Sequence, residues 1–373
     1  MKVAVIKLGA RIAFGAADTS GGNGEARSIL KIIKGSGTDV DVYTKVLKKD
    51  KNPKDYTFFN IEDEYTKIND REYEALIVLN GSVNYFGGGE CPDQILNYNL
   101  INNFKGKVFY LLCDPSLPLN QTWPSIEKKD WVGNWKKEDI LITRKDIIYV
   151  SQPYDLFAVK NDIIKKSKIE IGKVVHFPFE KFPCLNDKIK EVEVPEFDIL
   201  YGGTMRGNRR INKMVKFYFG YSDKLNVEMF GKIKPEDLDK IALKAGNPRP
   251  PSYGAAIAYD KFMEKMSNSL STVIIGDKWY EGKDMAQRCY ESIWSNVITF
   301  IDIELDPERR VYKDSEFCSK FNYVKNSLEV EKRIQMIKDK PSIRKMVLEE
   351  QIKAVAFNEK DYCNQFLDII KNN

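Results

Sequence analysis

Short apolar runs alternate along this chain with longer segments of helical periodicity, and this alternation constrains the fold more than any other feature. Apolar runs of about four to eight residues are typical of buried strands, and a helix between two such runs lets the second strand lie parallel to the first. In the first half, strands are predicted at Lys2–Lys7, Val40–Tyr43, Ala75–Leu79, Val108–Leu112, Ile147–Val150 and Val174–Phe177. In the second half, they are predicted at Asp198–Tyr201, Val227–Phe230, Thr272–Ile275 and Val297–Ile301. The pattern indicates an α/β protein with mainly parallel sheets.

Length and a break near the middle of the chain predict two domains. The chain has 373 residues, of which 43% are hydrophobic and 30% charged, and single domains usually hold ~100 to 200 residues. The stretch 186–195 is charged and ends at a proline, which is typical of a linker. We therefore place the N-terminal domain at 1–182 and the C-terminal domain at 196–355, both as doubly wound sheets. A helix over about 356–373 is expected to cross back to the first domain.

Composition narrows the possible environment and chemistry. A net charge of +5 permits a polyanionic partner without requiring one. The six cysteines form no CxxC pair or cluster with histidine, so reduced thiols are expected and no zinc site is predicted. No apolar run approaches the ~20 residues of a membrane span, and we expect a cytoplasmic monomer without a membrane partner. His176 is the single histidine, which favours a carboxylate as any general base.

Two stretches of the second half end an apolar run at glycine and then pass through a loop into a helical pattern. The first extends from Asp198 through Gly203 to Arg210, and the second from Ile274 through Gly276 to Glu291. In α/β sheets, ligands bind beyond the carboxyl ends of strands. Arginine binds diphosphate oxygens in pairs, and an ionised glutamate accepts hydrogen bonds from ribose hydroxyls. The two stretches therefore predict a sugar-nucleotide site.

Two segments of the first half complete a longer pattern, namely Val78–Gly88 and Tyr110–Pro124. Together with the second-half motifs, in the same order, they resemble the DNA β-glucosyltransferase family of T-even bacteriophages. The similarity covers nearly the whole chain, as far as Asp302–Asp306. Several motifs in a fixed order are more specific than one glycine signature. The resemblance implies the GT-B glycosyltransferase architecture, in which two Rossmann-like doubly wound domains face a cleft.

The resemblance implies inverting transfer of glucose from UDP-glucose to 5-hydroxymethylcytosine in duplex DNA, which protects phage DNA from host nucleases. The family flips its target base out of the helix, and its general base falls on Asp114. A carboxylate that takes the proton of the hydroxymethyl group would permit in-line displacement of UDP. Without the resemblance, Asp114 reads as a turn or cap residue before Pro115. Glu25 aligns with a glutamate near the sugar, but it is equally an ordinary acidic residue in the first turn of a helix.

The resemblance also assigns the nucleotide contacts. They fall on Gly203, Arg206, Arg210, Phe230, Gly231, Ile257, Tyr280, Arg288 and Glu291. Glu180 matches a residue at the cleft, although linker polarity explains it as well, and any single arginine could instead lie on a solvated helix face. Asp277 would touch the sugar or a Mg or Mn ion beside the diphosphate. No metal ligand set is predicted. The segment Asp39–Asp41 has the Asp-x-Asp pattern of metal-dependent transferases of another fold, but it lies in a strand pattern.

The acceptor is the least determined part of the prediction. Lysines at 45, 48, 49, 51 and 54, together with Arg144, Lys145, Lys160, Lys165 and Lys166, could contact DNA phosphates or serve only as solubilising charges. The loop Asn84–Gly88 resembles the family's DNA-facing loop, but Gly89–Cys91 lengthens it. Two alternatives therefore stay open: a transferase of the same fold with a non-DNA acceptor, and a DNA-binding module whose transferase site has decayed.

Overall fold

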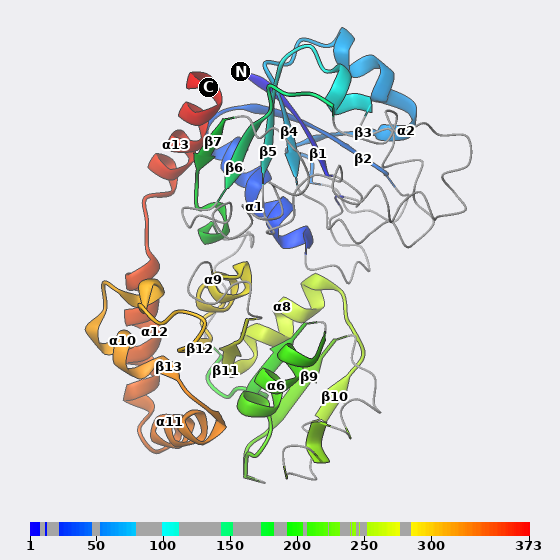
Figure 1. Ribbon diagram of the computed structural model, residues 1–373. Coiled ribbons are helices and arrows are strands. Elements are labelled where there is room, and N and C mark those ends of the chain that lie inside the picture. The colour runs from blue at the N-terminus through cyan, green and yellow to red at the C-terminus, as the bar shows by residue number, and fades with distance from the viewer. Residues whose placement is uncertain are drawn as a thin grey trace. The chain divides into compact units, whose positions relative to one another are not determined.

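The computed structural model describes residues 1–7, 12, 22–46, 53–79, 99–111, 143–151, 173–182, 192–203, 207–222, 224–231, 239, 241–243, 246, 252–276 and 285–373. These residues form two compact units (Figure 1). One unit contains the described residues up to Phe182 together with Asn358–Asn373, and the other contains those within Pro183–Phe357. Each unit is built around its own parallel sheet.

The first unit contains a seven-stranded sheet in the order β3-β2-β1-β4-β5-β6-β7, and every adjacent pair is parallel. The strands are β1 (Lys2–Lys7), β2 (Asp39–Thr44), β3 (Thr57–Asn60), β4 (Ala75–Leu79), β5 (Lys107–Leu111), β6 (Ile148–Ser151) and β7 (Val174–His176). The central strands are apolar and buried on both faces, as parallel strands between helices must be. The order reverses between β1 and β4, so the sheet is doubly wound.

The helices of this unit include a segment from the far end of the chain. They are α1 (Gly22–Gly35), α2 (Ile61–Glu64), η1 (Tyr65–Asp70), η6 (Phe179–Lys181) and α13 (Glu359–Asn372). Asn358 caps α13 by accepting hydrogen bonds from two backbone N–H groups of its first turn. The rings of Tyr362 and Phe366 lie 4.7 and 5.1 Å from that of Phe177, and Cys363 fits against Gly35 of α1. The C-terminal helix therefore completes the core of the first unit (Figure 1).

The second unit contains a six-stranded parallel sheet in the order β10-β9-β8-β11-β12-β13. The strands are β8 (Phe197–Gly202), β9 (Val227–Phe230), β10 (Ser252–Gly254), β11 (Ser269–Ile274), β12 (Ile298–Asp302) and β13 (Tyr323–Val324). The helices are α6 (Gly207–Tyr218), α8 (Tyr259–Ser267), α9 (Gln287–Trp294), η7 (Arg310–Tyr312), α10 (Glu316–Phe321), α11 (Ser327–Asp339) and α12 (Pro341–Val355). This sheet also reverses its order, between β8 and β11.

The α/β class and the parallel sheets predicted from the sequence are confirmed, and the differences lie at the sheet edges. The strands β3, β10 and β13, which are four, three and two residues long, were not predicted. In the described part of the chain, no helix has the length and apolarity needed to cross a membrane.

We predict that Phe366→Ala lowers the free energy of unfolding by about 3–5 kcal/mol, because this ring is 1% exposed and its removal leaves a cavity between α13 and β7. Urea unfolding followed by circular dichroism measures the change. Leu328→Ala is the control, since Leu328 is 68% exposed and its truncation should change stability by less than about 0.5 kcal/mol. Equal effects of the two substitutions would contradict the packing described for α13.

Candidate nucleotide-sugar site

The two glycine-ended strands predicted from the sequence are neighbours in the second sheet. Strand β8 ends at Gly202 and pairs in parallel with β11, which ends at Ile274. The chain leaves these strands in opposite directions, toward β9 on one side and β12 on the other. A crevice forms outside the carboxyl ends of parallel strands where the order reverses, and ligands of open α/β sheets bind there. The sheet topology therefore brings both motifs to the expected ligand-binding edge.

Backbone groups approach one another closely at this edge. The Gly203 N–H donates to the Phe230 carbonyl at 3.0 Å, and the Gly231 N–H donates to the Gly254 carbonyl at 3.3 Å. A Cβ atom on Gly231 would lie 1.7 Å from the carbonyl oxygen of Gly203. Position 231 therefore requires glycine, because the end of β8 occupies the space of a side chain.

An ion pair between a half-buried arginine and a buried glutamate lies beside the end of β8. Arg288 and Glu291 are three residues apart on one face of α9, and the Arg288 Nε donates to Glu291 Oε2 at 2.8 Å. Arg288 also donates to the Gly202 carbonyl at 3.2 Å, and its guanidinium stacks on the Phe262 ring at 4.3 Å. The other carboxylate oxygen, Glu291 Oε1, accepts from the Tyr259 hydroxyl at 2.6 Å. Two predicted site residues are thus held in one network.

Sequence reasoning missed Tyr259 and Phe262, which belong to this network. Both lie on α8, and 32 residues separate Tyr259 from Glu291. No local spacing rule connects residues on two different helices, so only the tertiary structure reveals the contact. The sequence has a helical pattern from about Asp260, which places Phe262 on a helix but does not connect it with Glu291.

Phe230 and Ile257 lie in the same unit but belong largely to its apolar core. Phe230 is 9% exposed and packs in a cluster with Tyr259 and Phe262, against which Ile257 is partly buried. The Lys265 ammonium lies 5.1 Å from the centre of the Phe230 ring, within cation–π range. Contact of Phe230 or Ile257 with a base stays a prediction.

Helix α6, which follows the glycine end of β8, is fixed to β12 by lysines. Lys213 donates to the buried carboxylate of Asp302 and, at 2.5 Å, to Glu304, and Lys216 donates to Glu304 at 2.6 Å. Burial raises the pKa of Asp302, and the Lys213 hydrogen bond opposes that rise. The hydrogen bonds from both lysines lower the pKa of Glu304 to about 2. These hydrogen bonds fix the second half of α6 to the end of β12.

Six of the remaining predicted site residues have no described side chain. Asp114, Arg206, Asp277 and Tyr280 lie outside the described residues. Glu25 is in α1 and Arg210 is in α6, but their side chains are outside the description too.

Glu180 is 3% exposed in η6 of the first unit. Burial raises the pKa of the Tyr362 hydroxyl on α13, and the negative charge of Glu180 raises it further.

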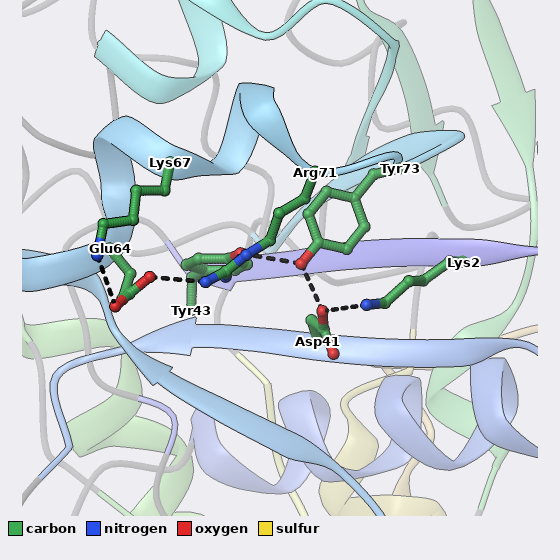
Figure 2. Close-up of polar contacts among 7 residues, drawn as sticks. All are labelled: Lys2, Asp41, Tyr43, Glu64, Lys67, Arg71 and Tyr73. Carbon is green, nitrogen blue, oxygen red and sulfur yellow. Dashed lines mark hydrogen bonds and ion pairs between the residues drawn. The ribbon is translucent and has the colours of Figure 1, made fainter.

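Asp41 of the Asp39–Asp41 sequence belongs to a polar network inside the first unit (Figure 2). Its carboxylate binds the Lys2 ammonium at 2.8 Å and accepts a hydrogen bond from the Tyr73 hydroxyl. The network continues through Tyr43 to Arg71. Asp41 therefore joins β1, β2 and the segment before β4. Among the residues with described positions, no three His, Cys, Asp or Glu side chains could together hold a metal ion.

Arg144 has a structural role that the sequence did not indicate. Its guanidinium donates to the carbonyl oxygens of Phe104 and Gly106 at 2.5 and 2.8 Å, and it pairs with Asp146 at 2.5 Å. Only 12% of the side chain is exposed. Its donors therefore hold the bend that precedes β5, and contact of Arg144 with DNA phosphates stays a prediction.

We predict that Gly231→Ala destabilises the second unit by about 3 kcal/mol, since the new methyl group must displace the backbone at the end of β8. Thermal unfolding of the purified protein measures the loss. Gly203→Ala is the matched control, because the three nearest atoms to its Cβ, at 2.8 to 3.5 Å, would belong to the Tyr201 side chain rather than to backbone, and it should cost less. A larger loss of stability for Gly203→Ala would contradict the backbone crowding described at Gly231.

Comparison with known proteins agrees with this geometry. The family model of the bacteriophage T4 beta-glucosyltransferase matches residues 1–188. The DNA beta-glucosyltransferase of Enterobacteria phage T4 is 29% identical over 357 residues, which cover 94% of this chain and 93% of the relative. Its structures in complex with UDP-glucose and with UDP and Mn²⁺ each show 25% identity over 99% of both chains, with TM-scores of 0.78 and 0.79.

A further solved structure supports the fold alone. The glycosyltransferase WaaG of lipopolysaccharide biosynthesis matches 100% of both chains with a TM-score of 0.50 and 13% identity. The two parallel sheets with their helices are thus consistent with the GT-B fold. Because the family model matches more than half of the 373 residues, the chain belongs to the bacteriophage T4 beta-glucosyltransferase family.

Proposed function

We propose that this protein transfers glucose from UDP-glucose to the hydroxymethyl group of a modified base, 5-hydroxymethylcytosine, in duplex phage DNA. The observation that carries the proposal is the network of Gly202, Arg288 and Glu291 at the edge where the second sheet reverses its strand order. Membership of the T4 beta-glucosyltransferase family supplies the reaction class. The modification would protect phage DNA from nucleases in the cytoplasm of the infected host.

The second unit would bind the nucleotide of the donor. Arg206, Arg210 and Arg288 would neutralise the diphosphate, because guanidinium groups stay charged and bind two oxygens at once. Glu291 would accept hydrogen bonds from the ribose hydroxyls, and Phe230, Ile257 and Tyr280 would contact the base. Stabilisation of the departing UDP by arginines removes the need for a general acid.

The first unit would hold the sugar and the acceptor. The carboxylate of Asp114 would take the proton of the hydroxymethyl oxygen, which then forms its bond to the anomeric carbon as the bond from that carbon to UDP breaks. Attack from the face opposite UDP inverts the anomeric configuration. Glu25 and Glu180 would lie near the sugar. The target base must leave the stack to reach Asp114, at a cost of a few kcal/mol that protein contacts recover.

A divalent cation would be bound mainly by the donor itself. Mg²⁺ and Mn²⁺ prefer oxygen ligands, and Mg²⁺ commonly takes one or two carboxylates together with substrate phosphates. Asp277, which follows Gly276 in the sequence, would join the diphosphate oxygens as a ligand of such an ion. Such an ion would add positive charge beside the leaving UDP.

The proposal predicts hexose transfer that depends on the acceptor hydroxyl. We expect duplex DNA containing 5-hydroxymethylcytosine to gain one glucose per modified base from UDP-glucose, as measured by mass spectrometry of its nucleosides. DNA containing 5-methylcytosine is the control, because it differs only by the missing hydroxyl. A panel of other UDP-sugars tests the donor.

Two other results would replace the proposal by an alternative. Transfer to small acceptors without a salt-dependent shift of duplex DNA in electrophoresis would indicate a non-DNA acceptor. Salt-dependent DNA binding without transfer or hydrolysis of UDP-glucose would indicate a decayed transferase.

Two substitutions separate catalysis from donor binding. Asp114→Asn removes the base but keeps the side-chain shape, so we expect turnover to fall by about 100- to 10,000-fold while UDP affinity survives. Arg206→Ala should weaken UDP binding at least about tenfold, because it removes charge-assisted hydrogen bonds to the diphosphate. Calorimetry with UDP and single-turnover transfer assays measure the two quantities. Loss of UDP binding in Asp114→Asn would assign this aspartate a structural role.

A further inference from the structure

Tyr259 and Arg288 hold the two oxygens of the Glu291 carboxylate from two different helices. The Tyr259 hydroxyl, at the start of α8, donates to Oε1 at 2.6 Å, and the Arg288 Nε of α9 donates to Oε2 at 2.8 Å. Tyr259 and Glu291 are each 5% exposed. Each oxygen of the carboxylate therefore accepts a hydrogen bond from a side chain of a different residue, in a largely buried environment.

Both donors are themselves fixed in place. The Tyr259 ring packs in an apolar cluster with Phe262, Met263 and Phe230. The Arg288 guanidinium is fixed by the Gly202 carbonyl at 3.2 Å and by stacking on the Phe262 ring. A group whose partners are locked by packing keeps its geometry before the ligand arrives. Glu291 is therefore preorganised, and α8 contributes to this as much as α9 does.

A carboxylate held in this way suits a ligand that presents two adjacent donors. An ionised carboxylate oxygen can accept about two hydrogen bonds, so a donor already in place does not prevent that oxygen from accepting one from a ligand. The 2′ and 3′ hydroxyls of ribose are two such donors on adjacent carbons. A deoxyribose presents only one, and sites built to bind a hydroxyl discriminate strongly against analogues that lack it.

We infer that Tyr259 is a positioning residue that makes the site selective for ribonucleotides over deoxyribonucleotides, by holding Glu291 Oε1 toward the ribose hydroxyls. The inference deepens the proposed function and rests on it, since it assumes that Glu291 binds the ribose of a UDP-sugar. It also adds α8, which sequence reasoning did not include, to the donor site.

A second Tyr–carboxylate–Arg arrangement in the same unit provides a matched control. The Tyr323 hydroxyl donates to Asp306 Oδ2 at 2.5 Å, and the Arg310 Nε donates to Asp306 Oδ1 at 3.3 Å. Tyr323 and Asp306 are buried as deeply as Tyr259 and Glu291. Tyr323→Phe therefore removes the same kind of hydrogen bond as Tyr259→Phe, without touching Glu291.

The test compares the affinities for UDP, 2′-deoxy-UDP and 3′-deoxy-UDP by calorimetry, in the full-length protein and the two variants. In the parent protein we expect UDP to bind at least about tenfold more tightly than either analogue, because a hydrogen bond to a charged acceptor is lost. In Tyr259→Phe this preference should fall to within about threefold for at least one analogue, through weaker UDP binding. Tyr323→Phe should keep the full preference.

The remaining outcomes each count against one proposal. An unchanged preference in Tyr259→Phe, or equal weakening of all three ligands, would overturn the positioning role while leaving the proposed transferase intact. Failure of the parent protein to bind UDP would instead remove the proposed function. Melting temperatures check that both variants fold. Should Tyr259→Phe not fold, Tyr259→Met fills the space with a flexible apolar side chain and carries the same test.

Discussion

The close approach of two strand ends is the constraint on which the candidate site depends. The Gly203 carbonyl occupies the position of a side chain on Gly231, so the ends of β8 and β9 can meet only as bare backbone. Their hydrogen bonds extend to β10 through Gly254. A rim of backbone without intervening side chains lets a nucleotide approach main-chain groups directly. It also fixes the Gly202 carbonyl as an anchor for Arg288, and through Arg288 it sets the position of Glu291.

Burial of charged groups at this rim has an energetic cost that the fold offsets with specific partners. An ionised group moved from water into protein loses several kcal/mol of hydration, which only good geometry and additional hydrogen bonds can compensate. Glu291 has Arg288 and Tyr259, and Asp302 has Lys213. The same partners that compensate for burial also restrict motion. Preorganised charge at the strand ends is therefore a by-product of stabilising the buried carboxylates.

The central architecture could be predicted from the sequence, whereas contacts between distant elements could not. Apolar runs such as Ala75–Leu79 identify buried parallel strands, and the spacing of Arg288 and Glu291 places them on one helical face. The edge strand β10 consists of Ser252, Tyr253 and Gly254, of which only Tyr253 is hydrophobic, so it contains no apolar run to detect. The contact of Tyr259 with Glu291 joins two helices, and the internal role of Arg144 depends on carbonyls near β5. Such pairings are decided by tertiary packing, which local patterns do not encode.

The two Tyr–carboxylate–Arg arrangements of the second unit show why pairing alone does not identify a functional carboxylate. Asp306 accepts from Arg310 and from the Val311 N–H, both in its own loop, and from Tyr323 on the adjacent strand, so its hydrogen bonds tie that loop to the sheet. Glu291 has a similar pair of side-chain donors, but its arginine continues to the carbonyl end of β8 at the point where the strand order reverses. The chemistry of the two carboxylates is alike, and their connections differ. What distinguishes Glu291 is therefore its link to the ligand-binding edge of the sheet, since a carboxylate that stabilises a loop needs no such link.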